Sequence, residues 1–143
     1  MKTSTLRSMI VVAALAVAAG TVSAQTMNVR IPMSFRAGDT GMAAGDYQVH
    51  LASGISGVPV VYLRNAETLK SVILMPPVRS DAPKAWLQDG TPRLSFTCAD
   101  SSCTLTKMWN GDGGTAYGFN TPKLPSIQAR DLTTITLAMV KAH

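Results

Sequence analysis

The chain has 143 residues and a formal net charge of +5, and 46% of its residues are hydrophobic. This length corresponds to one ordinary domain, and the hydrophobic content excludes an intrinsically disordered chain. The Lys and Arg residues are scattered singly, without the concentrated basic surface that nucleic-acid binding requires. We therefore expect no nucleic-acid partner.

The first 24 residues have the three parts of a secretory signal peptide. Lys2 and Arg7 form a basic start, and the uncharged apolar run Met9–Ala19 follows them. Val22–Ala24 then provides the small residues that signal peptidase requires, just before Gln25. The apolar run is shorter than the roughly 20 residues of a membrane-spanning helix. We expect this helical segment to be cleaved, which places the protein in the periplasm or outside the cell.

Cleavage after residue 24 would leave residues 25–143, 119 residues that we expect to form a single β domain. Lys2 and Arg7 leave with the signal peptide, so 11 basic residues remain against 8 acidic ones and the net charge falls to +3. No second apolar segment approaches membrane-spanning length, so we expect no membrane span in the mature chain.

The first half of the mature chain alternates apolar and polar residues, which predicts strands with one buried face. The expected strands are Thr26–Phe35, Asp46–Leu51, Val58–Leu63 and Leu69–Met75. The last of them is a more continuous apolar run, typical of a strand covered on both faces. Pro32 cannot donate to a sheet ladder, so we expect the first strand to lie at an edge or to be bulged.

The second half of the chain indicates two hairpins and a last strand. Ala85–Gln88 and Arg93–Cys98 flank Asp89-Gly90, a favoured hairpin turn. The strand that ends at Cys98 is then expected to pair with a strand through Cys103 and Leu105. A short alternating segment follows with Tyr117 and Phe119, and we expect residues 122–131 to form a loop with one helical turn. Thr134–Met139 alternates as the last strand. Seven or eight strands without a helix predict an all-β fold, an antiparallel sandwich or barrel.

Cys98 and Cys103 are the only cysteines, and an even count in an exported chain predicts a disulfide. Symmetric pairing across the loop between them places the two directly opposite each other, within the Cα separations that a disulfide tolerates. Such a short bridge contributes roughly 2 kcal/mol and fixes the strand register. The C-x4-C spacing lacks further zinc ligands, and a β-turn is not the helix start typical of redox pairs.

The sequence contains no motif for catalysis or metal binding. His50 is the only internal histidine, and the alternation places it on the outward face of its strand. Nearly all of the eight carboxylates lie in or beside turns, which does not predict a glycosidase pair. Asn110–Gly113 has too few carboxylates for a calcium loop, and the dispersed methionines are typical of core packing. We expect no enzymatic activity, no cofactor and no metal.

Trp109, Tyr117 and Phe119 flank the glycine-rich loop Asn110–Gly114. Aromatic faces beside a loop can stack on sugars or on the side chains of a protein partner, which makes these three residues the candidate contact residues. The alternative is that all three rings belong to the core. The sequence leaves both open.

Two stretches resemble a group of small exported β proteins that is common in Acidobacteria and related soil bacteria. Phe35–Gly38 followed by Ala44–Val49 resembles the group's F-x-x-G and P-A-G-x-Y-x-V motifs, and Arg93–Phe96 leading to Leu105 and Trp109 resembles a second stretch. The chain departs from the group at Ala43-Ala44, where Leu/Val-Pro is frequent, and in its cysteine pair. The resemblance implies an exported all-β domain, and no activity or functional residue is carried over with it.

These observations predict an exported, non-enzymatic β protein with a structural or binding role in the cell envelope or outside the cell. The alternative is a carbohydrate- or peptide-binding module that uses the loop at 109–119. A third hypothesis is that Met27–Phe35 or Thr134–Met139 pairs as an edge strand with a partner. A glycan or an envelope protein is the candidate partner in these cases.

Overall fold

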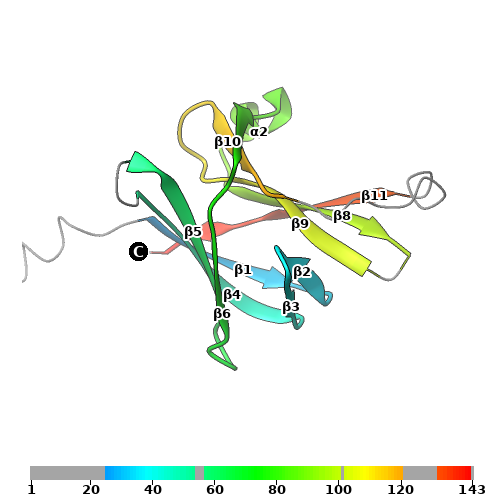
Figure 1. Cartoon of the computed structure of the whole chain (residues 1–143). Coiled ribbons are helices and arrows are strands. Elements are labelled where there is room, and N and C mark those ends of the chain that lie inside the picture. Colours follow the sequence, from blue (N-terminus) through cyan, green and yellow to red (C-terminus); the bar gives the residue numbers. More distant parts are fainter. Residues whose placement is uncertain (1–24, 54–56, 101, 121–131, 143) are drawn as a thin grey trace, which may run out of the picture.

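The computed structural model describes residues 25–53, 57–100, 102–120 and 132–142, which fold into two β-sheets (Figure 1). The expected signal peptide at 1–24 and the loop expected at 122–131 lie outside the described residues.

The first sheet has five strands, and each neighbouring pair is antiparallel. Their order is β12 (Val140–Lys141), β1 (Gln25–Ile31), β4 (Gly45–Ser53), β5 (Pro59–Asn65) and β6 (Ser71–Leu74). The first half of β4 alternates, with Tyr47 and Val49 buried and Gln48 exposed, which is the pattern of a sheet with one face on the core.

The second sheet has seven strands. Its main order is β11 (Thr133–Ala138), β8 (Arg93–Ala99), β9 (Ser102–Trp109), β10 (Thr115–Gly118) and β7 (Val78–Asp81), with the hairpin of β2 (Phe35–Ala37) and β3 (Thr40–Met42) beside β9. β2 runs parallel to β9, and the remaining pairs are antiparallel. Neither sheet closes into a barrel over the described residues, so the predicted all-β class is confirmed in its sandwich form.

The described residues form twelve strands, more than the seven or eight expected. The difference lies in elements of two to four residues, such as β2, β3, β7 and β12, which are too short to show a periodic pattern. The expected first strand is in fact two: β1 ends at Ile31, just before Pro32, and β2 begins at Phe35. The expectation of one strand that continues through Pro32, either at an edge or bulged there, was wrong, because β1 ends before Pro32 and lies between β12 and β4.

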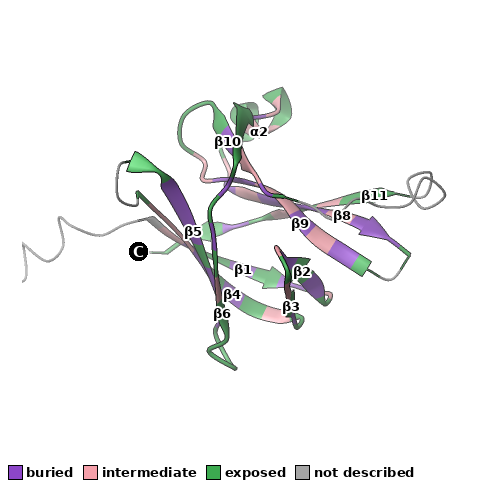
Figure 2. Cartoon of the chain, viewed as in Figure 1, coloured by how far each residue is buried: buried purple, intermediate pink, exposed green. Residues whose placement is uncertain are grey.

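The core lies between the two sheets, as the burial pattern in Figure 2 shows. Phe35 of β2 contacts Tyr47 of the first sheet and Phe96 of the second, edge to face, with ring centroids 5.3 and 5.4 Å apart. One aromatic side chain therefore joins the inner faces of both sheets.

Ala85–Gln88 was expected as a strand, and the structure has a helix there instead, α2 (Lys84–Asp89). The segment follows Pro83 and ends at Gly90, which has a φ of +71° and donates its N–H to the Trp86 carbonyl at 2.8 Å. Asp89-Gly90 is therefore a helix end and not a hairpin turn, because glycine favours this left-handed helix end as well. Trp86 stacks on Trp109 with ring centroids 6.5 Å apart.

The chain passes between the sheets at four places. It crosses from β1 to β2, returns from β3 to β4, crosses again from β6 to β7 through Met75, Pro76 and Pro77, and returns from β11 to β12 through Met139. Met139 is buried and donates its backbone N–H to the Pro92 carbonyl at 2.8 Å. The two sheets are thus joined through the backbone as well as through the core.

Candidate functional site

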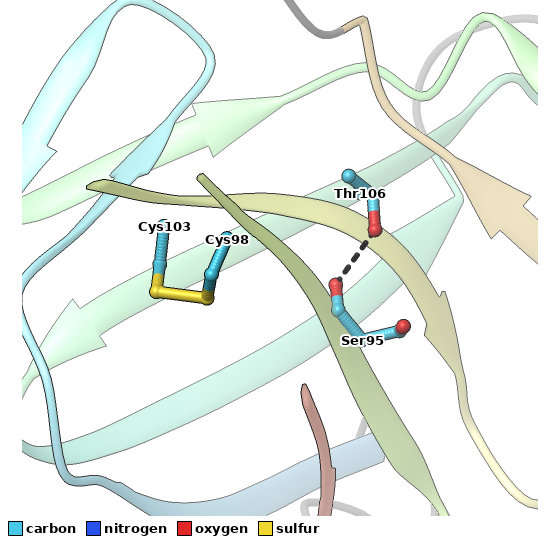
Figure 3. Close-up of a disulfide and its surroundings, with 4 residues drawn as sticks. All are labelled: Ser95, Cys98, Cys103 and Thr106. Atoms are coloured by element: carbon cyan, nitrogen blue, oxygen red, sulfur yellow. Dashed lines mark hydrogen bonds between the residues drawn. A yellow bond between two sulfur atoms is a disulfide. The ribbon is translucent and has the colours of Figure 1, made fainter. Parts of the chain in front are cut away.

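The predicted disulfide is confirmed at the end of the β8–β9 hairpin (Figure 3). Cys98 and Cys103 are directly opposed in the ladder, with their Cα atoms 4.0 Å apart, and each is 8% exposed. An open hollow of about 660 Å³ lies beside the bridge, lined by Pro32, Met33, Asp100, Thr133, Ile135 and the two cysteines. Asp100 is its only ionisable side chain, so the hollow has no acid–base pair.

A β-bulge in the same hairpin lies next to the hydrogen bond that positions Phe119, one of the candidate contact residues. The register between β8 and β9 shifts at Ser95/Phe96, where the Thr106 hydroxyl donates to the Ser95 carbonyl at 3.0 Å (Figure 3). The Thr106 carbonyl in turn accepts the backbone N–H of Phe119 at 2.9 Å. The bulge therefore holds the chain after β10 against the hairpin.

The three candidate aromatic residues lie in different surroundings. Trp109 is 1% exposed, packs with Ala82, Trp86 and Ala116, and donates its indole N–H to the Gly113 carbonyl at 3.2 Å. Phe119 is 8% exposed and belongs to the main core. Tyr117 alone is half-buried, on β10 opposite Arg79 of β7. Stacking on a ligand at this loop therefore remains a prediction for Tyr117, while the other two rings serve packing.

The glycine-rich loop that these residues flank has a hydrogen bond within it and a contact to β12, both at Asp112. The Asn110 side-chain carbonyl accepts the Asp112 N–H at 3.1 Å, and the Lys141 ammonium group lies 3.5 Å from an Asp112 carboxylate oxygen. Gly111 and Gly113 have φ values of +84° and +67°, which explains why glycine is used there. Over the described part of the chain, no group of three or more His, Cys, Asp or Glu side chains could hold a metal ion.

His50 lies on the outer face of the first sheet, half-buried, because its neighbour Val49 points into the core. Its Nδ1 is hydrogen-bonded to the Thr26 hydroxyl at 2.9 Å, and its ring lies edge-on to Tyr62 with centroids 5.9 Å apart. The register continues from Tyr62 to Ile73 on β6. These four side chains thus form one cross-strand row that ends at the edge of the sheet.

β6 forms that edge, and in the described chain its only strand neighbour is β5. The expectation that this apolar run is covered on both faces was wrong, because Ile73 is 58% exposed and Met75 is 69% exposed. Val72 and Leu74 point inward, so the run alternates after all. A continuous apolar run cannot distinguish a covered strand from an edge strand with an exposed apolar face.

A groove of about 490 Å³ lies between β6 and the β2–β3 hairpin. It is lined by Ala37, Gly38, Asp39, Thr40, Val72, Ile73, Leu74, Met75, Phe119 and Asn120. Gly38 has a φ of +61°, and a Cβ there would lie 3.3 Å from Leu74 Cδ2, so the hairpin approaches β6 closely at its turn. The Lys70 ammonium group donates to the Gly41 carbonyl at 2.9 Å and holds the hairpin to the start of β6.

This groove was not foreseen, although it contains Phe119. Its walls come from three segments that are far apart in the sequence, and no local pattern shows that they meet. The exposed apolar residues of β6 were visible in the sequence as the run that ends at Pro76-Pro77.

No helix of the described chain is long and apolar enough to cross a membrane. Comparison of the chain with models of known protein families, with curated proteins and with solved structures gave no match.

Proposed function

We propose that the protein is exported through its N-terminal signal peptide and acts without catalysis, as a binding or structural protein of the cell envelope or the exterior. In this proposal it binds an extended segment of a partner protein along the edge of β6. The observation that carries the proposal is the groove between β6 and the β2–β3 hairpin.

The edge of β6 is suited to a peptide in an extended conformation. An edge strand presents backbone N–H and C=O groups that another strand can pair with, and such pairing is a common mode of peptide recognition. Ser71–Leu74 carries no charge, and Ile73 and Met75 expose apolar surface beside it. An uncharged segment with alternating apolar side chains would therefore complement this edge.

The hairpin side of the groove is held in place independently of any partner. Lys70 donates a hydrogen bond to the Gly41 carbonyl, and the turn at Gly38 lies so near Leu74 that a Cβ there would be 3.3 Å from Leu74 Cδ2. The groove thus exists in the free protein, so a peptide would not have to open it, and this lowers the cost of binding.

Export is supported by the Cys98–Cys103 bridge together with the signal-peptide pattern. Disulfides persist in oxidising compartments and are rare in the cytosol. Expression of the full chain in a bacterium, followed by fractionation and N-terminal sequencing, tests this part. A mature protein that begins at Gln25 outside the cytoplasm is expected, and an uncleaved cytoplasmic protein would contradict it.

Peptide binding is tested by selection from a library of short random peptides, followed by titration of the selected peptides. Ile73→Lys is expected to weaken their binding, on the order of tenfold or more, because it places a charge in the apolar contact. Val140→Lys is the matched control, since Val140 is 69% exposed on β12 at the opposite edge of the same sheet. Equal effects of the two variants, or no selected peptide, would refute the β6 site.

A further inference from the structure

Asn110 differs from the other asparagines in the residue that follows it. The chain contains Asn28, Asn65, Asn110 and Asn120, and only Asn110 precedes a glycine. It lies directly after β9, in the glycine-rich loop for which the proposed function has no use.

An asparagine can react with the backbone of the next residue. The backbone N–H loses its proton, and its nitrogen attacks the side-chain amide carbon to form a new C–N bond. The bond from this carbon to the side-chain nitrogen then breaks, and that nitrogen takes up a proton and leaves as ammonia. Water then opens the resulting five-membered succinimide at either carbonyl, which gives aspartate or isoaspartate. A Cβ on the following residue hinders the approach of the nitrogen, and glycine removes that obstacle.

The loop also provides a hydrogen-bond donor for this step. The Asp112 N–H donates to the Asn110 side-chain oxygen at 3.1 Å. Negative charge develops on this oxygen when the amide carbon becomes tetrahedral, and a donor already in place stabilises such a charge. Asn110 is half-buried and residues 112–114 are exposed, so water can reach the site.

Asn65 is the natural residue to compare with Asn110, because its side-chain oxygen also accepts backbone N–H groups but the residue is buried. Its side-chain oxygen accepts the N–H groups of Glu67 at 2.9 Å and Thr68 at 3.0 Å, but the residue is 3% exposed. The next backbone nitrogen, that of Ala66, donates to the Asp46 carbonyl at 2.8 Å and is held there. The donors alone therefore do not make Asn65 reactive, since its attacking nitrogen is fixed and carries a Cβ beside it.

We propose that Asn110 is a modification site at which the folded protein deamidates through a succinimide with Gly111. Both products place a carboxylate two residues from Asp112, which faces Lys141 of β12 at 3.5 Å. Isoaspartate also lengthens the backbone by one methylene group directly after the buried Trp109. The reaction changes charge and chain path beside β12, the edge strand of the first sheet, and it does not depend on export or on a partner.

The test is peptide mapping by mass spectrometry of purified protein that has been incubated at mildly alkaline pH. We expect conversion at Asn110 to exceed that at the other three asparagines on the order of tenfold or more, with both aspartate and isoaspartate formed. A parallel incubation in denaturant shows whether the folded loop itself permits the reaction. Conversion that occurs only in denaturant, or equal conversion at Asn65 in the folded protein, would overturn the proposal.

Asn110→Gln is the matched variant, because its longer side chain would have to form a six-membered ring. The variant is expected to lose the acidic species that accumulate in the original protein. Acidic species that persist in Asn110→Gln at the original rate would place the reaction elsewhere. If this variant does not fold, the comparison of Asn110 with Asn65 in the original chain still decides the question.

Discussion

Strands β8 and β6 both carry several apolar residues but differ in how far these residues are buried. Five of the seven residues of β8 are buried, whereas Leu74 is the one buried residue among the four of β6. β8 has strand neighbours on both sides and a disulfide at its end, while β6 has one strand neighbour in the described structure. The difference teaches that position in the sheet decides what an apolar strand does: the same kind of residue forms the core in one place and an open edge in the other.

The largest loss of stability is expected from the truncation of a buried side chain in the β8–β9 hairpin. Phe96 of β8 is completely buried and contacts Phe35, which also contacts Tyr47. Phe96→Ala should lower the free energy of unfolding by about 3–5 kcal/mol, because it removes apolar burial and leaves a cavity. Urea unfolding monitored by circular dichroism measures the change. A loss as small as that of an edge substitution would show that this hairpin is not the stable part of the fold.

Removal of the disulfide should lower the free energy of unfolding by an intermediate amount. The replacement of Cys98 and Cys103 by Ala together is expected to cost about 2 kcal/mol, because the bridge closes only a short loop in the unfolded chain. Reduction of the original protein, checked by thiol titration and followed by the same urea unfolding, is the control without a mutation. Complete unfolding on reduction would contradict the prediction that the bridge fixes register in an otherwise stable fold.

A pair of glycine substitutions tests how closely the β2–β3 hairpin approaches β6. Gly38→Ala and Gly113→Ala should each cost about 1 kcal/mol, since both positions have positive φ values. Gly38→Ala should cost a few tenths more, because its Cβ would lie 3.3 Å from Leu74 Cδ2, whereas a Cβ at Gly113 would meet nothing within 4 Å. Urea midpoints of the two variants give the difference. Equal costs would argue against a close contact at the turn.

The smallest effect on stability is expected at the edge itself. Ile73→Lys should change the free energy of unfolding by less than about 0.5 kcal/mol, because Ile73 is 58% exposed. Its neighbour Leu74 is 8% exposed, and Leu74→Ala should cost about 2 kcal/mol. Thermal or urea unfolding of the two variants compares adjacent residues of one strand. A large loss from Ile73→Lys would mean that something covers β6.

The features that the sequence predicted correctly depend on short-range patterns. Alternation located the strands through Tyr47 and Phe96, and the four residues between Cys98 and Cys103 placed the bridge. Both signals lie within one strand or one hairpin, where side-chain direction follows from residue order alone.

The features that were missed depend on contacts between distant segments. The helix α2 replaces an expected strand because six residues are too few for a helical period, and Trp86 is stabilised there by Trp109 of another element. The groove depends on the approach of Gly38 to Leu74, which no local pattern contains. The burial of Trp109 likewise depends on α2, because Trp86 of this helix packs on it. The sequence alone therefore could not distinguish a core position for Trp109 from a position in a binding loop.

Pro76 and Pro77 lie between β6 of the first sheet and β7 of the second. Proline fixes φ, and consecutive prolines favour an extended, stiff backbone with a rise of about 3.1 Å per residue. The pair therefore works as a spacer of set length, which keeps β6 and β7 a constant distance apart. With two flexible residues in its place, the distance between the end of β6 and the start of β7 would vary, so this rigid link restrains the position of one sheet relative to the other.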